Sequence, residues 1–171
     1  MFNNHFEIFD LPVSFAVDID TLAQRYRDLQ RAVHPDKYAN APAQERRLAM
    51  QKATQVNAAF QTLKDPLARG LYLLQLQGIE INDNNIKMDN EFLLEQMDLR
   101  EQLAEIKQHK QPLKALNDFL ERMTQEQRNL ADTLTQQFAQ KNYQLAFDTV
   151  RKFQFFTRLQ EEALSLEEGL L

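Results

Sequence analysis

Apolar residues in the second half of the chain recur at near-heptad spacing over an unusually long stretch. Between residues 112 and 141 they are Leu113, Leu116, Leu120, Met123, Leu130 and Leu134. Steps of three, four and seven residues place such side chains on one face of an α-helix. At 1.5 Å per residue, a helix over 112–141 would be roughly 45 Å long. A helix of that length with one apolar face needs other long helices to cover it.

The rest of the chain has the same helical character. Further helices are predicted over 20–33, 43–64, 67–76, 90–109 and 143–167. The 171 residues include only 3 glycines and 5 prolines, a composition that favours long helices over strands. Pro35 and Pro112 are expected to end the helices that precede them, because a residue before proline is disfavoured in the α region. The predicted fold class is therefore all-α.

A polar stretch divides the chain. Asn82-Asp83-Asn84-Asn85 is typical of a turn and marks the expected domain boundary. We therefore expect an N-terminal domain over 1–77, a linker over 78–85 and a C-terminal domain over 86–171. Long helices with short connections fold back antiparallel, so the C-terminal domain is expected to be a three-helix bundle.

Composition excludes several kinds of chemistry. The chain has no cysteine, which excludes disulfides, thiolate metal sites and cysteine catalysis. The histidines at 5, 34 and 109 have no metal-ligand spacing, so neither a metal nor another cofactor is expected. The glycines at 70, 78 and 169 are scattered and form no phosphate-binding loop, so the chain is not expected to bind ATP in the usual way.

Charge and hydropathy limit the kinds of partner and the cellular compartment that we expect for the protein. A net charge of −5 argues against nucleic acid as the main partner. No run of 18 apolar residues exists that could span a membrane, and the N-terminus does not resemble a signal peptide. We expect a soluble cytoplasmic protein that binds neither nucleic acid nor membrane.

An enzymatic role is the weakest alternative. Carboxylate pairs such as Glu161-Glu162 or Glu91 and Glu95 could in principle act as acid and base. No histidine, serine or cysteine visibly converges with them, and exposed helix faces explain them adequately. We therefore predict that the protein is not an enzyme.

The sequence His34-Pro35-Asp36-Lys37 lies between two amphipathic helical segments and follows a basic one. This arrangement resembles the J-domain, the module that activates the ATPase of DnaK-type chaperones. The resemblance implies a J-domain over 1–77. It also implies a chaperone-binding site made of His34, Pro35, Asp36, Lys37, Arg25, Arg27 and Arg31.

The charges of this region suit such a role. Arg27 and Arg31 lie one helical turn apart, opposite the apolar stripe from Leu22 to Val33, and are expected to face solvent, with Arg25 at the edge of that stripe. An exposed basic face would attract an acidic chaperone surface and raise the association rate. Asp36 would offer a carboxylate to an arginine of the chaperone.

Longer stretches resemble the HscB family, the co-chaperones of iron–sulfur cluster assembly. They are Asn57–Pro66 with Arg69, Tyr72, Leu73 and Leu74, then Phe92–Glu101 and Asp148–Lys152. The resemblance covers nearly the whole chain and implies two partners: an HscA-type, DnaK-like chaperone and an IscU-type scaffold protein. Met97 and Asp98 stand where relatives often have Leu and Glu. The absence of a cysteine-bearing N-terminal segment points to a bacterial type without zinc.

The predicted helix over 90–109 carries more apolar residues than one face requires. Phe92, Leu99, Leu103 and Ile106 form a stripe for the bundle core, and Leu93, Leu94 and Met97 lie on another face. These three residues and Phe155 could simply be buried against the J-domain or a third helix. The family resemblance instead implies a scaffold-binding site of Leu93, Leu94, Met97, Asp98, Arg100, Glu101, Glu105 and Phe155. Phe155 lies only at the edge of the apolar stripe of the last helix.

The sequence therefore predicts an adaptor, which binds the scaffold, delivers it to the chaperone and stimulates ATP hydrolysis. The alternative is a general J-domain co-chaperone that serves unfolded clients. Such proteins usually add glycine- and phenylalanine-rich or cysteine-rich segments, which this chain lacks.

Overall fold

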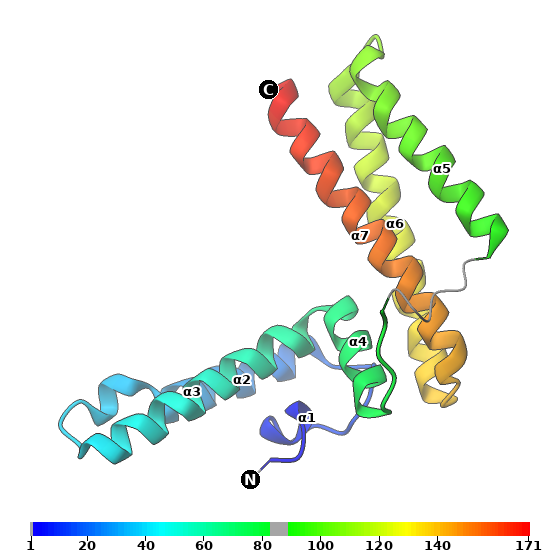
Figure 1. Cartoon of the computed structure of the whole chain (residues 1–171). Coiled ribbons are helices and arrows are strands. Elements are labelled where there is room, and N and C mark those ends of the chain that lie inside the picture. Colours follow the sequence, from blue (N-terminus) through cyan, green and yellow to red (C-terminus); the bar gives the residue numbers. More distant parts are fainter. Residues whose placement is uncertain (1, 83–88) are drawn as a thin grey trace. The chain divides into compact units, whose positions relative to one another are not determined.

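The computed structural model describes residues 2–82 and 89–171, and helices are the only regular elements in these ranges (Figure 1). This confirms the all-α fold class. The chain divides into two compact units, Met1–Gly78 and Ile79–Leu171. The predicted linker over 78–85 and the domain start at 86 stay predictions, because residues 83–88 lie outside the described part.

Two long antiparallel helices form an arm in the N-terminal unit (Figure 1). The elements of this unit are α1 (His5–Ile8), α2 (Ile19–Val33), the 3₁₀ helix η1 (Pro35–Tyr38), α3 (Ala43–Lys64) and α4 (Pro66–Leu76). Asp18 begins α2 by accepting hydrogen bonds from the backbone N–H groups of Thr21 and Asp20, and these bonds lower the pKa of its carboxyl. The arm carries the loop at residues 34–37 at its outer end.

A short helix and a buried arginine close the base of the arm. Helix α1 was not predicted, because four residues are too few to show a helical period; Asn4 caps it by accepting from the N–H of Glu7. Arg69 is buried, donates to the carbonyl of Leu63 at 2.6 Å and lies 4.7 Å from the centre of the Phe15 ring. This guanidinium therefore ties the end of α3 to the start of α4.

The C-terminal unit is a three-helix bundle, as predicted (Figure 1). It contains α5 (Asn90–Glu105), the 3₁₀ turn η3 (Ile106–Gln108), α6 (Pro112–Ala139) and α7 (Tyr143–Leu170). Helices α6 and α7 form an antiparallel hairpin, and α5 packs beside one half of it. Their shared core consists of Phe92, Leu99, Ile106, Leu116, Phe119, Met123, Phe155, Phe156, Leu159 and Ala163. The predicted helix over 90–109 is shorter because its last turn tightens into η3 before Pro112.

The α6–α7 connection is a tight turn with a left-handed residue. Lys141 has φ of 57°, and its N–H donates to the carbonyl of Phe138 at 3.0 Å. The N–H of Asn142 donates to the carbonyl of Gln137 at 2.9 Å. This pair of bonds is the Schellman arrangement that ends many helices, usually with glycine in the left-handed position.

Replacing Lys141 with glycine should stabilise the protein. A residue with a Cβ atom pays roughly 1 kcal/mol to adopt the left-handed conformation, and glycine does not. Part of this gain is lost because glycine gives the unfolded chain more conformational entropy. Lys141→Gly should raise the free energy of unfolding by about 0.5 kcal/mol in guanidinium titrations followed by circular dichroism. Lys141→Ala, which removes the same long side chain but keeps a Cβ, should give no such gain. Equal stability of the two variants would contradict the strain argument.

Candidate functional site

The loop at the end of the arm is held by its own histidine. The N–H of Asp36 donates to Nδ1 of His34 at 3.2 Å, and Pro35 occupies the first position of η1. The hydroxyl of Tyr38 donates to the carbonyl of Ala32 at 3.5 Å and ties η1 back to α2. The Asp36 side chain is 94% exposed. The loop therefore presents one carboxylate on a short, constrained backbone.

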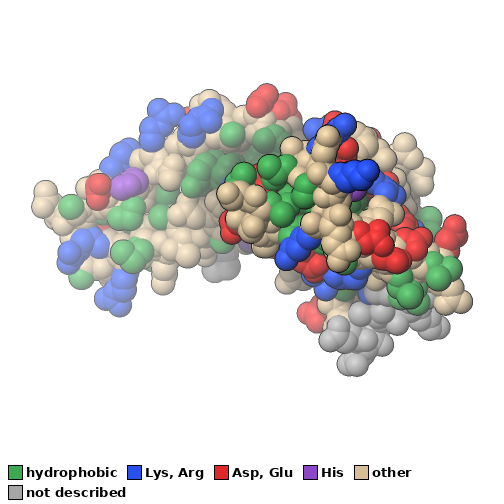
Figure 2. Space-filling view, turned by 90° about the horizontal axis from the view of Figure 1, so that it is seen from above, with side chains coloured by type: hydrophobic (Ala, Val, Ile, Leu, Met, Phe, Trp, Pro, Cys, Tyr) green, Lys and Arg blue, Asp and Glu red, His purple; other side chains and the backbone are tan. Residues whose placement is uncertain are grey.

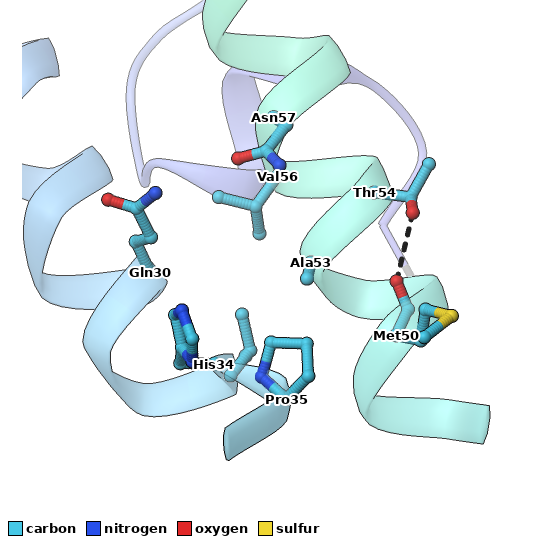
Figure 3. A pocket seen from close by; sticks show the side chains of 9 residues that line it. Gln30, His34, Pro35, Met50, Ala53, Thr54, Val56 and Asn57 are labelled. Atoms are coloured by element: carbon cyan, nitrogen blue, oxygen red, sulfur yellow. Dashed lines mark hydrogen bonds between the residues drawn. The ribbon is translucent and has the colours of Figure 1, made fainter. Parts of the chain in front are cut away.

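A pocket of about 250 Å³ opens between α2 and α3 beside this loop. The rings of His34 and Pro35 stand on one side of it and Met50 and Ala53 on the other (Figure 3). Its remaining lining residues are Gln30, Val33, Thr54, Val56 and Asn57. The loop and the pocket thus form one continuous surface at the tip of the arm.

Basic side chains lie along the arm (Figure 2). Arg27, Arg31 and Lys37 are exposed, as the sequence predicts. The guanidinium of Arg27 donates to Oε1 of Gln24, and that of Arg31 pairs with Asp28 at 2.9 Å, with both partners more than half exposed. Such exposed pairs are weak in water. Both arginines therefore remain available to an acidic partner.

Arg25 has a structural role that the sequence did not predict. Its Nη1 donates to the backbone carbonyls of Phe9 at 2.7 Å and Asp10 at 2.5 Å, and the side chain is half-buried. Asp10 has φ of 51°, a left-handed conformation. Arg25 fixes the protein's own N-terminal loop, and its part in the chaperone-binding site stays a prediction.

The outer face of α5 is apolar and exposed. Leu93, Leu94 and Met97 are 39%, 64% and 67% exposed. They are therefore not core residues of the C-terminal unit. Asp98, Glu101 and Glu105 are also exposed on α5. Figure 2 shows hydrophobic and acidic side chains together on the C-terminal unit. We call Leu93, Leu94 and Met97 the α5 patch.

Phe155, which was predicted to belong to the same site, is buried at 6% exposure. Its ring packs edge-on against Phe92 and Phe156, with ring centres 5.6 Å and 5.4 Å apart. The stripe-edge position of Phe155 turns its ring under α5 and not outward. We therefore assign it to the support of α5, beneath the surface that a partner would contact.

Arg100 lies where α5 meets α7. Its Nη1 approaches both carboxylate oxygens of Glu162, at 3.0 Å and 3.1 Å, and its guanidinium lies 5.6 Å from the centre of the Phe155 ring. The side chain of Arg100 is 50% exposed and that of Glu162 47%. Glu162 was absent from the predicted site, because a partner 62 residues away in sequence gives no spacing signal.

Comparison with known proteins identifies the family. The family model described as the HSCB C-terminal oligomerisation domain matches residues 88–164, and the DnaJ domain model matches residues 4–72. The chain is 41% identical over 172 residues to a Shewanella pealeana co-chaperone protein HscB homolog, with 98% of this chain and 99% of the relative covered. The chain belongs to the HscB family. Its first half is a J-domain.

Solved structures of HscB proteins agree with this assignment. Chaperone HscB from Vibrio cholerae matches with a TM-score of 0.88 at 43% identity, over 98% of this chain and 99% of that one. Human co-chaperone HscB matches with a TM-score of 0.89 at 34% identity, over 99% of this chain and 84% of that one. The chain is thus an HscB-family co-chaperone, and a co-chaperone with a J-domain implies a chaperone partner.

The described residues add two observations on other kinds of site. Within them, no cluster of three or more His, Asp or Glu side chains is placed to hold a metal ion. None of the helices in residues 2–82 and 89–171 has the length and apolar character to cross a membrane.

Measuring the free energy of unfolding of variants can separate the structural role of Arg25 from a role in binding. Arg25→Gln removes charged hydrogen bonds to two carbonyls and should lower the free energy of unfolding by roughly 1–3 kcal/mol. Arg27→Gln, two residues away on the same helix and exposed, should change it by less than about 0.5 kcal/mol. Thermal or urea unfolding of the two variants makes the comparison. Similar losses from both variants would contradict the assignment of Arg25.

Proposed function

We propose that this HscB-family protein is an adaptor between an HscA-type, DnaK-like chaperone and an IscU-type iron–sulfur scaffold protein. Its J-domain stimulates ATP hydrolysis by the chaperone, and its C-terminal unit carries the scaffold. The α5 patch is the observation that carries this proposal. A J-domain alone serves any client, whereas an exposed apolar face on a rigid helix needs a defined partner.

The proposed chaperone contact combines long-range electrostatic attraction with a specific ion pair made by one carboxylate. Exposed Arg27, Arg31 and Lys37 attract an acidic chaperone surface over a distance of about a Debye length, near 8 Å at physiological salt. Asp36 then meets a cation of the chaperone. Because the backbone beside Asp36 is already fixed by His34, little conformational entropy is lost when that contact forms.

The scaffold contact has an apolar centre and a charged rim. Leu93, Leu94 and Met97 supply apolar area, and Met adapts its shape to a partner more easily than branched side chains do. The exposed acids Asp98, Glu101 and Glu105 provide charge on one flank. Arg100, held by Glu162, provides the opposite charge on the flank beside α7. This polarity selects one orientation of the scaffold.

The carboxylate of Asp36 should be essential for stimulation. Asp36→Asn keeps the size of the side chain and removes the charge, so it should abolish the rise in ATP turnover by an HscA-type chaperone. Helix content and scaffold binding should stay at wild-type values, because Asp36 is almost fully exposed. Steady-state ATP hydrolysis with and without scaffold is the measurement. Full stimulation by the variant, or none by the wild-type protein, would overturn the proposed chaperone role.

The α5 patch and its support should respond differently to truncation. Replacing Leu93, Leu94 and Met97 with Ala should weaken scaffold binding by about a thousandfold or more, since burial of each side chain contributes roughly 1.5–3 kcal/mol. The melting temperature should hardly change. Phe155→Ala should instead cost roughly 3–5 kcal/mol of stability, as buried phenylalanines do.

Scaffold affinity by calorimetry and melting by circular dichroism, both on the same variants, test this pair of expectations. Unaltered scaffold binding by the triple variant would place the scaffold elsewhere. Loss of binding to an unfolded model client as well as to the scaffold would favour the general J-domain co-chaperone.

A further inference from the structure

The pocket beside residues 34–37 is not explained by the contacts proposed so far. Asp36 and the basic side chains are exposed to solvent and do not line the pocket, which opens between α2 and α3 (Figure 3). We propose that it is a socket for one aliphatic side chain from an acidic segment of the chaperone. This inference rests on the proposed function, which it extends by a further contact site.

The floor and walls of the pocket suit an aliphatic group. Val33, Pro35, Ala53 and Val56 present only carbon atoms in their side chains, and Val56 is 6% exposed. Met50 lies at the mouth and is 60% exposed. A hollow of about 250 Å³ has the volume to take one aliphatic side chain.

The rim offers hydrogen bonds for a peptide backbone. Tyr26 donates to Oδ1 of Asn57 at 2.8 Å and accepts from Nε2 of Gln30 at 3.3 Å. These bonds orient both amides and leave the Asn57 nitrogen as a donor and the Gln30 oxygen as an acceptor. One donor and one acceptor on facing helices match the C=O and N–H of a single peptide segment.

Charge around the mouth favours an acidic segment. A second, shallower hollow lined by Gln30, Arg31, His34 and Lys37 shares Gln30 and His34 with the pocket. A carboxylate next to the aliphatic residue would therefore meet Arg31 or Lys37, both of them exposed. The same cations disfavour a second copy of this arm, because its own tip carries the same positive charges.

Filling the pocket tests the inference without touching any charge. Ala53→Leu adds three carbon atoms inside the pocket, and Ala58→Leu adds them to an exposed side of α3 that does not line it. With an HscA-type chaperone, Ala53→Leu should raise the half-maximal stimulating concentration at least tenfold, equivalent to ~1.4 kcal/mol. Ala58→Leu should change it less than twofold, and both variants should keep wild-type helix content.

A second pair of variants covers the case in which Ala53→Leu disturbs folding. Met50 and Leu48 are both exposed on α3, but only Met50 lines the pocket. Met50→Gln should raise the half-maximal concentration about fivefold, and Leu48→Gln less than twofold.

The outcomes separate this inference from the function on which it rests. Matching stimulation curves for Ala53→Leu and Ala58→Leu would overturn the socket, and a raised melting temperature of Ala53→Leu would then identify the pocket as unfilled core. A changed oligomeric state of Ala53→Leu in sedimentation, with normal stimulation, would assign the pocket to a second copy and also overturn it. If wild-type protein stimulates and Asp36→Asn does not, the proposed function stands whichever result the pocket gives.

Discussion

An amphipathic helix buries one face, and the number of neighbours it has decides what remains exposed. Helices α2 and α3 have mainly each other along the arm, so their outer sides are polar and basic and a pocket stays open between them. Helix α5 covers half of the α6–α7 hairpin and buries Phe92 and Leu99, which leaves its opposite side in solvent. Both candidate sites follow from this single packing constraint.

The two surfaces carry opposite charge, although the chain as a whole is only moderately acidic, with a net charge of −5. The J-domain tip is basic and the outer side of α5 is rimmed with carboxylates. The predominant charge of each surface would give each proposed partner its own favourable approach and oppose exchange of the partners between the surfaces. Specificity of this kind requires no contact between the two sites.

Local signals in the sequence predicted most of the fold. The predicted helix over about 43–64 matches α3, because Pro42 directly precedes the segment and Asp65-Pro66 directly follows it. The motif at residues 34–37 and the excess apolar residues of α5 marked both candidate sites, whose roles stay predictions. The roles of Arg25 and Phe155 could not be predicted in this way. Their partners lie in other elements, and a position at the edge of a helical stripe can turn either inward or outward.

Residues that lie beneath or beside an exposed surface also determine its shape. Phe155 is buried beneath α5, and Glu162, itself half-exposed, fixes Arg100 at the edge of α5. Substitutions at such positions act on binding by moving the side chains that do make contact.

The attachment of Arg25 has a mechanical meaning. Arg25 lies about two helical turns, or roughly 12 Å, before the end of α2, and it grips the loop at Phe9 and Asp10. A load applied at the tip of the arm would act on α2 along its axis. The guanidinium would pass part of that load into the loop next to the buried rings of Phe6 and Phe9. The attachment therefore braces the long helix against displacement relative to the N-terminal loop.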